Sequence, residues 1–361
     1  GLTLTEGMVA EWYVEPGTKV SAGDEIMEIE TTKITNVFES PAGGTLRRQV
    51  TPQGASVPIG GLLAVLADDS VVESEIDAFI AKFQAEFVPP EGDAGAATSG
   101  PVMIEAGGRC LRYLRLGPEG GVPILFIHGF GADINAWMFN QSFLAEHQAT
   151  YALDLPGHGR SSKEGHGGQA ATLVAAVLDF MAAVSIARAH LVGHSLGGAL
   201  ALGLAHAHPD RVASLTLIAP VGLGPEINMA FIDGFIRADK RKEAKQVLEL
   251  LVADPGAVSR TMVDEVLKYK RLDGVAAALR TIAAATFPGG RQIENLRHAL
   301  ATATLPRQVI WGSADRIIPV SHADGLPPAV AVHRLDGAGH LAQMEMSSEV
   351  NRLIADLVSA E

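Results

Sequence analysis

The fold is decided by residues 191–204, which read LVGHSLGGALALGL. The apolar residues before Gly193 are typical of a buried strand, and the alanine- and leucine-rich residues after Ser195 are typical of a helix. Glycines two residues before and two residues after the serine allow the close backbone approach that a sharp strand-to-helix turn needs. The pattern G-x-S-x-G is weak alone, but between a strand and a helix it predicts a nucleophilic serine at Ser195.

Two loops after this turn carry the expected partners of Ser195. At a turn of this kind, the acid and then the histidine follow the serine along the chain. Asp315 follows the strand-like segment Val309–Trp311, and His340 follows Val332–Leu335. Both positions are strand ends, where open α/β sheets collect catalytic groups. We predict that His340 takes the proton of Ser195, while Asp315 orients the imidazole and stabilises its charged form.

Two backbone N–H groups are predicted to stabilise an oxyanion beside Ser195. One belongs to Leu196, the residue after the nucleophile. The other belongs to Phe130, in a His-Gly-Phe-Gly loop that follows the segment Ile124–Ile127. Each such donor lowers an acyl-transfer barrier by about 3 kcal/mol.

Two further polar residues near these loops are interpreted as structural. His128 opens the loop that holds Phe130, and we expect it to brace that loop rather than carry a proton. Asp154 begins the turn Asp154–Ser162. We expect this turn to brace the site, because Asp315 already has the position of the acid.

Strand-like and helical segments alternate from about residue 102 to the end of the chain. The continuous apolar runs suit a sheet covered on both faces, so the pattern predicts a doubly wound, mostly parallel α/β sheet. Residues 221–300 interrupt the alternation with helical segments and are predicted to form a cap over one end of the sheet. The predicted strands are Ile124–Ile127, Tyr151–Leu153, His190–Val192, Leu215–Ile218, Val309–Trp311 and Val332–Leu335.

Residues 1–67 have a different pattern, in which short strand-like segments are separated by turn signals. Val9–Val14, Glu25–Glu30 and Ile34–Phe38 are the clearest of these segments. Repeated short strands in so short a stretch predict a small all-β barrel or sandwich. Lys33 lies in a polar turn between two of the strands, where its amine would be exposed to a modifying enzyme.

The two patterned regions are joined by a helical stretch and a linker. Within residues 72–88, apolar side chains recur on one helical stripe, which we expect to pack against one of the domains or to bind a partner. The stripe consists of Ile76, Phe79, Ile80, Phe83 and Phe87. Residues 89–101 are rich in Pro, Gly and Ala and predict a linker. The expected domains are therefore 1–70, a connecting region 71–101, and 102–361 with the cap inserted at about 221–300.

The charge of the chain limits its partners. It has 361 residues and a net charge of −13, which disfavours nucleic-acid binding. Most of the excess negative charge lies in residues 1–92, which have 15 acidic and 5 basic side chains.

We expect neither a membrane span nor a secretory signal, because the sequence has no long apolar run and no basic segment that leads into one. The single cysteine, Cys110, fits a reducing, cytoplasmic location, and we predict no metal site.

The β-rich region resembles the lipoyl domains of 2-oxoacid-type dehydrogenase complexes over residues 1–67. The resemblance implies that Lys33 carries lipoate in amide linkage at a hairpin tip. Related biotin carriers usually have methionine on both sides of the lysine, whereas Thr32 and Ile34 stand here. One departure is that the commonest lipoyl pattern has aspartate in place of Thr32.

Residues 102–361 resemble the α/β-hydrolase family, and the whole chain is similar to the dihydrolipoamide acetyltransferase components of bacterial acetoin dehydrogenase complexes. This resemblance implies transfer of an acetyl group from the arm on Lys33 to CoA, through Ser195. It implies two partners, a thiamine-diphosphate-dependent acetoin-cleaving enzyme and a flavin dihydrolipoamide dehydrogenase, and a homo-oligomer. The His-x-x-x-Asp-Gly motif of ordinary dehydrogenase-complex acyltransferases is absent.

Two alternative functions remain open at this point. A Ser–His–Asp hydrolase, either a thioesterase or a carbon–carbon-bond hydrolase, could use the lipoyl domain only for docking. The second domain could instead be a scaffold that makes little use of Ser195. The two alternatives predict acetate without CoA dependence and unchanged complex turnover in Ser195→Ala, respectively.

The predicted cap contains a basic cluster of Arg237, Lys240, Arg241, Lys242 and Lys245. A solvated helix face is one interpretation of this cluster. A docking face for CoA phosphates or for the acidic lipoyl domain is the other. Nearby Met229, Phe231 and Phe235 are interpreted as core residues or as the lining of an acyl pocket.

Overall fold

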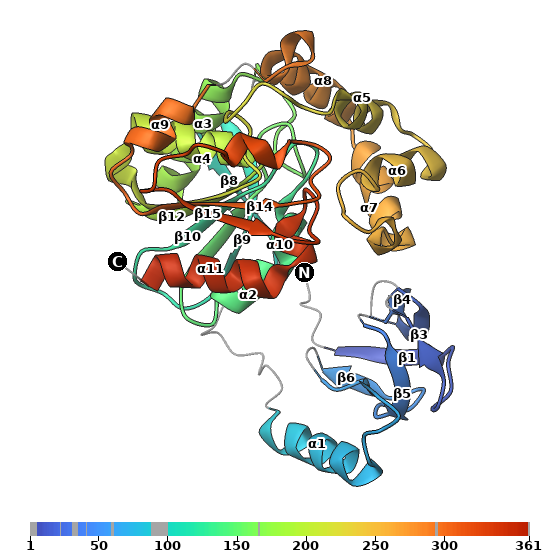
Figure 1. The fold of residues 1–361 in the computed structure, drawn as a ribbon. Helices are drawn as coiled ribbons and strands as arrows, with labels where there is room; N and C mark the ends of the chain where they lie inside the picture. Colours follow the sequence, from blue (N-terminus) through green and yellow to red (C-terminus); the bar gives the residue numbers. More distant parts are fainter. Residues whose placement is uncertain are drawn as a thin grey trace. The chain divides into compact units, whose positions relative to one another are not determined.

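The computed structural model describes residues 6–21, 23–30, 35–40, 42–58, 61–87, 100–164, 167–292 and 295–359. The chain divides into two compact units, residues 1–95 and 96–361 (Figure 1). Lys33 and residues 88–99 of the predicted linker lie outside the described residues.

The N-terminal unit consists of two small antiparallel sheets around an apolar core. One sheet has the strand order β4-β3-β1-β6 and the other β2-β5-β7. The buried residues come from both sheets: Val9, Val20, Ile26, Met27 and Leu46. The strands are β1 Glu6–Trp12, β2 Lys19–Val20, β3 Glu25–Glu30, β4 Thr35–Glu39, β5 Gly44–Gln49, β6 Ser56–Pro58 and β7 Ala64–Ala67.

Strands β3 and β4 flank the residues that contain Lys33. They pair antiparallel, and Glu30 lies opposite Thr35 at the end of the ladder. Two antiparallel strands whose last paired residues are separated by four residues of the chain are typical of a hairpin. The described strands therefore fit the turn that the sequence predicts around Lys33.

Helix α1 (Glu73–Glu86) lies where the stripe of apolar residues predicts a helix, and it is fixed to the N-terminal unit at its first two turns. Ile76 is buried there, whereas Phe79 remains about half exposed. Arg47 of β5 pairs with Glu73 at 2.6 Å, and Arg48 pairs with Glu73 at 2.8 Å. The later aromatic residues of the stripe contact one another: the ring centroids of Phe79 and Phe83 are 6.4 Å apart, and those of Phe83 and Phe87 are 5.4 Å apart.

The second unit is built on an eight-stranded sheet with the order β15-β14-β13-β12-β10-β11-β9-β8. Pairing is parallel from β11 through β15, and β8 and β9 form an antiparallel hairpin at the other edge. All six predicted strands are present, and the two hairpin strands are additions that the sequence analysis did not name. The strands are β8 Val102–Ala106, β9 Arg109–Leu116, β10 Ile124–Ile127, β11 Thr150–Leu153, β12 Ala189–His194, β13 Val212–Ile218, β14 Arg307–Gly312 and β15 Ala331–Leu335.

Two apolar cores lie on opposite faces of this sheet. In β10, Leu125 and Ile127 face one core, and Ile124 and Phe126 face the other. Helices α3 (Ala170–Ala183) and α4 (Leu196–Ala207) belong to the first core, together with α9 (Arg297–Thr302). Helices α2 (Met138–Leu144) and α11 (Ser347–Ser359) belong to the second, and α10 (Ala342–Glu345) precedes α11. Figure 1 shows the two groups of helices on opposite faces, as a doubly wound sheet requires.

An insertion between β13 and β14 supplies the remaining helices. It contains α5 (Met229–Arg237), α6 (Arg241–Leu248), α7 (Arg260–Lys270) and α8 (Val275–Thr286), followed by α9. We call α5–α8 the cap, and Figure 1 shows it as a separate group of helices beside the sheet. Among the described helices, none combines the length and apolar character that crossing a membrane requires.

The docking of α1 yields a stability prediction. We expect Ile76→Ala to lower the free energy of unfolding of the N-terminal unit by about 2–5 kcal/mol, because it leaves a cavity at a buried contact. Phe79→Ala removes a half-exposed ring and should change that free energy by less than about 1 kcal/mol. Hydrogen exchange of the β5 and β7 amides in the full chain measures both. Equal loss of protection in the two variants would contradict the packing described here.

Candidate active site

Ser195 lies at the turn between β12 and α4, in a strained conformation. Its φ is 54° and its ψ is −117°, in a region that residues with a side chain rarely adopt. Both neighbouring glycines are required by space. A Cβ on Gly193 would overlap the carbonyl of Gly197, and a Cβ on Gly197 would overlap the carbonyl of Ile127. The strand–turn–helix context that the sequence predicts is therefore present.

Asp315 and His340 come together from loops after β14 and β15. His340 Nδ1 is 2.8 Å from Asp315 Oδ2, and both side chains are buried. The indole N–H of Trp311 also donates to Oδ2, at 3.0 Å. The backbone N–H groups of Ile317 and Ile318 donate to Oδ1 at 2.7 and 3.0 Å. The carboxylate is thus fully hydrogen-bonded, and it fixes the orientation of the His340 ring.

The charge of Asp315 is favoured despite its burial. Burial raises the pKa of a carboxyl group, but the neighbouring His340 and the hydrogen bonds from His340, Ile318 and Ile317 outweigh that effect. The net result holds the pKa of Asp315 below its ordinary value. An ionised Asp315 can therefore stabilise a positive charge on His340.

His194, the variable residue just before the serine in the G-x-S-x-G motif, supports the loop of His340. The two imidazole rings are 4.7 Å apart, and Nε2 of His194 lies 2.9 Å from the carbonyl oxygen of His340. Burial, with a contribution from His340, lowers the pKa of His194 to about 3. His194 is therefore neutral, donates from Nε2, and does not compete with His340 for a proton. The motif does not specify this residue, so sequence reasoning assigned it no role.

The N–H groups of Phe130 and Leu196 are both open. Phe130 follows β10, and Leu196 is the first residue of α4. Among the described residues, neither N–H has a hydrogen-bond acceptor. Gly129 brings the two loops together, since a Cβ there would lie 3.0 Å from the Cβ of Ser195. Two open donors thus lie beside a buried serine, and their role as an oxyanion hole stays a prediction.

His128 braces the loop that holds Phe130, as the sequence interpretation proposes. Its Nδ1 is 2.8 Å from the carbonyl of Gly129, and its Nε2 accepts from the N–H of Leu155 at 3.1 Å. Complete burial lowers its pKa, so the ring is neutral. Asp154 is a second brace, because its carboxylate accepts from the N–H groups of Ile134 and Arg160, each at 2.8 Å.

A cap segment, residues 249–253, is hydrogen-bonded to the loops that hold the acid and the histidine. We call it the strap. The carbonyl of Leu251 accepts from the N–H groups of His340 and Leu341, at 2.8 and 3.2 Å. Glu345 bridges the same parts, because its carboxylate accepts from Ala253 N at 2.7 Å and from Gly339 N at 2.9 Å. Arg316 donates to the carbonyl of Val252 at 2.7 Å. No local sequence signal marks these contacts.

Aromatic side chains cover residues 128–131, which we call the oxyanion loop after the predicted role of Phe130. The ring of Phe130 contacts Phe235 of the cap and Phe287 just after α8, with centroids 6.3 and 6.4 Å apart. Ser195 and His340 are only 6% and 2% exposed. Within the described residues no hydrogen bond joins these two side chains, and catalytic hydrogen bonds often tighten only when substrate is bound. The structure therefore holds the site closed to solvent.

Comparison with protein-family models defines the class of this protein. Residues 122–346 match the alpha/beta hydrolase fold, and residues 1–66 match the biotin-requiring enzyme model of carrier domains. Among solved structures, 2-hydroxy-6-oxo-6-phenylhexa-2,4-dienoate hydrolase from Rhodococcus sp. strain RHA1 is similar, with a TM-score of 0.63 and 22% identity over 72% of this chain and 99% of that chain. The fold that the sequence predicts is confirmed.

Full-length relatives identify the family. The dihydrolipoyllysine-residue acetyltransferase component of the acetoin cleaving system of Pseudomonas putida is 46% identical, over 98% of this chain and 94% of its own length. The component of the same name from Cupriavidus necator is 43% identical over the same shares. The chain belongs to this family of acetyltransferase components, which confirms the predicted acyltransferase class and the predicted lipoyl domain.

His128 provides a test of the brace. We expect His128→Ala to lower the free energy of unfolding of the second unit by about 2–5 kcal/mol, because it leaves a buried N–H and a buried carbonyl without partners and opens a cavity. Urea denaturation measures this change. His206→Ala, at an exposed position of α4, is the matched control and should be nearly neutral. An unchanged free energy of unfolding in His128→Ala would contradict the role of His128 as a brace.

The low pKa of Asp315 predicts a pH dependence of stability. A carboxyl group with a lower pKa in the folded state stabilises the fold above its unfolded-state pKa, near 3.9, and that stabilisation is lost as the pH falls through its folded-state value. Asp315→Asn should therefore lose stability less steeply than wild type on acidification below about pH 4. Parallel urea titrations between pH 3 and pH 6 test this, and identical slopes would refute it.

Proposed function

We propose that Ser195 takes the acetyl group from S-acetyl-dihydrolipoyl-Lys33 and that CoA then removes it as acetyl-CoA, within an acetoin cleaving system. The observation that carries the proposal is the buried Asp315–His340 pair in the same site as a strained serine and two open N–H groups. These are the parts that acyl transfer through a serine ester requires.

In the first half-reaction, Ser195 Oγ attacks the thioester carbonyl while His340 takes the hydroxyl proton. The N–H groups of Phe130 and Leu196 hold the oxyanion. The C–S bond then breaks, and His340 gives its proton to the departing sulfur. Asp315 remains ionised and stabilises the imidazolium between the two proton transfers.

In the second half-reaction, His340 takes the proton of the CoA thiol. The thiolate attacks the carbonyl of acetyl-Ser195, the C–O bond breaks, and His340 returns the proton to Ser195 Oγ. Atoms and charges balance without any further reactant. The two half-reactions use the same donors, so one closed site serves both acyl partners.

Lipoate on Lys33 supplies a dithiol that carries the acyl group as a thioester on a long arm. The described strands β3 and β4 fit a hairpin that presents such an arm. Tethering also gives the donor a high effective concentration. In the proposed cycle, a thiamine-diphosphate-dependent enzyme cleaves acetoin and loads the arm, and a flavin dihydrolipoamide dehydrogenase reoxidises the dithiol.

The burial of the site favours transfer over hydrolysis. Water competes with CoA for an acyl-serine wherever it reaches the carbonyl. Here Phe130, Phe235 and Phe287 pack over the oxyanion loop, and Ser195 is nearly inaccessible to solvent. The CoA thiol enters on a long arm that can displace this cover and contact the side chains around it, which a free water molecule cannot do.

The fate of the acyl group tests the proposed function. The purified chain is given acetyl-dihydrolipoamide with and without CoA, and acetyl-CoA and acetate are quantified. We expect acetyl-CoA from wild type and a loss of at least about 10³-fold in Ser195→Ala. Ser142→Ala, an exposed serine of α2, is the matched control and should retain full activity.

The other outcomes correspond to the alternative functions. Acetate formed at the same rate with and without CoA would indicate a thioesterase. Full complex turnover by Ser195→Ala would leave the second unit with a scaffolding role. Either result would overturn the proposed acyl-serine route.

A further inference from the structure

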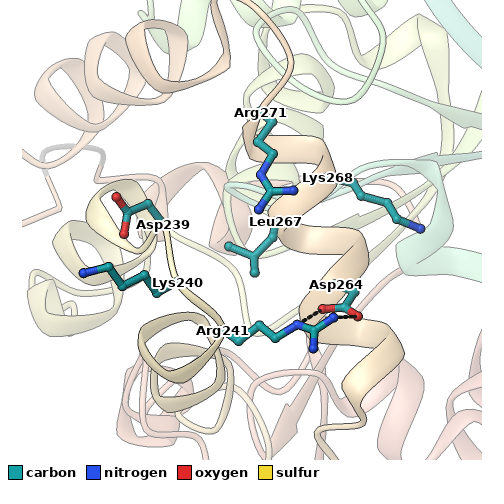
Figure 2. Close-up of a pocket in the computed structure, with 7 residues that line it drawn as sticks. All are labelled: Asp239, Lys240, Arg241, Asp264, Leu267, Lys268 and Arg271. Atoms are coloured by element: carbon teal, nitrogen blue, oxygen red, sulfur yellow. Dashed lines mark hydrogen bonds and ion pairs between the residues drawn. The ribbon is translucent and has the colours of Figure 1, made fainter.

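The cap contains a pocket lined by charged residues on two facing helices. It has a volume of about 540 Å³, which is within the range of small-molecule sites. Figure 2 shows α6 and the residues before it on one side and α7 on the other, with Arg271 extending over Leu267 into the space between them. The pocket is lined by Asp239, Lys240, Arg241, Asp264, Leu267, Lys268 and Arg271. Four cations and two carboxylates give the lining a positive charge.

Two of the four cations are free to meet a ligand. Arg241 is held by Asp264 through two hydrogen bonds of 2.8 and 2.7 Å, and Lys268 is held by Glu265 at 2.6 Å. Within the described part of the chain, the side chains of Lys240 and Arg271 make no ion pair or hydrogen bond. The basic cluster predicted from the sequence thus contributes Lys240 and Arg241. Lys268 of α7 and Arg271 just after it lie too far along the chain to be grouped with them.

The start of α6 opens on the same pocket. The residue before the helix, Lys240, makes no side-chain capping hydrogen bond. Among the described residues, the N–H groups of Arg241, Lys242 and Glu243 have no acceptor. Open N–H groups at a helix start favour an anion, and here they accompany two unpaired cations.

The pocket lies next to the cover of the candidate active site. Lys270 Nζ is 5.5 Å from the ring centroid of Phe235, and it donates to the carbonyl of Ala238. Ala238 and Lys270 directly precede the pocket residues Asp239 and Arg271. Phe235 in turn contacts Phe130, the residue of the second oxyanion donor. Phe235 therefore contacts both Phe130 and Lys270, the chain neighbour of the pocket residue Arg271.

We propose that this pocket binds the phosphate groups of CoA while the pantetheine arm passes Phe235 to bring the thiol to Ser195. The inference rests on the proposed function and names the acceptor's binding site. A long flexible arm separates the thiol of CoA from its phosphates, so the phosphates bind at a distance from the buried reaction centre, in a pocket that is open to solvent. A concave pocket with arginine and open N–H groups suits phosphate oxygens. The acidic lipoyl domain would instead require a broad surface.

Kinetics with two acceptors distinguish the binding of the CoA phosphates from the reaction of the CoA thiol. Acetyl transfer from acetyl-dihydrolipoamide is measured with CoA and with pantetheine, which has the thiol but no phosphate. The variants are Arg271→Gln, Lys240→Gln and their combination. Arg280→Gln, at an exposed position of α8 outside the pocket, is the matched control. We expect each pocket variant to raise the KM for CoA about threefold to tenfold, with an unchanged kcat and an unchanged KM for pantetheine.

A binding measurement makes the result independent of catalysis. Calorimetry with adenosine 3′,5′-bisphosphate, which has no thiol, should show binding to wild type and to Arg280→Gln and a loss of at least about tenfold in the double variant. If no acetyl-CoA forms but this nucleotide still binds through Arg271, the proposed function fails and the pocket assignment stands.

Three results would overturn the pocket assignment. An unchanged KM for CoA in the double variant would do so, as would an equal rise in the KM for pantetheine. A raised KM for the acetylated lipoyl chain, with the KM for CoA unchanged, would assign these cations to domain docking instead.

Discussion

The close approach of Gly197 to the carbonyl of Ile127 sets the geometry of the candidate site. It draws the start of α4 against the end of β10, so the N–H of Leu196 and the loop of Phe130 meet at one point. The same contact leaves Ser195 no unstrained path between strand and helix, and its φ of 54° follows. The sheet stabilises this turn through the many apolar side chains that β10, β12 and α4 bury together, which offset a backbone strain of about 1–3 kcal/mol.

Sequence patterns predicted the parts of the fold whose cause is local. The glycines around Ser195 mark a backbone position where no side chain fits, and that requirement is visible in the residues themselves. Asp315 and His340 follow apolar runs, so their positions at strand ends could be inferred without coordinates. The N-terminal unit was recognisable because short strands and turn residues alternate there.

The remaining features depend on contacts between residues far apart in the chain. Leu251 meets His340 only after the cap folds back on the sheet, and a carbonyl acceptor has no sequence signature. The sequence favoured core packing for Phe235 over a place in an acyl pocket, but it could not predict the contact of this ring with Phe130, which depends on tertiary packing. The hairpin β8–β9 lies at an edge of the sheet, where charged side chains interrupt the apolar pattern that marks the inner strands.

The strap couples the position of the cap to the position of the His340 loop. Because the carbonyl of Leu251 holds the backbone of His340, and Glu345 ties Ala253 to the neighbouring Gly339, the cap and the histidine loop share their hydrogen bonds. A cap displaced far enough to break these bonds would release the loop that holds His340. If Ser195 forms the proposed ester, an open cap would expose that ester to water without an aligned His340, and the ester would persist until the cap closed again.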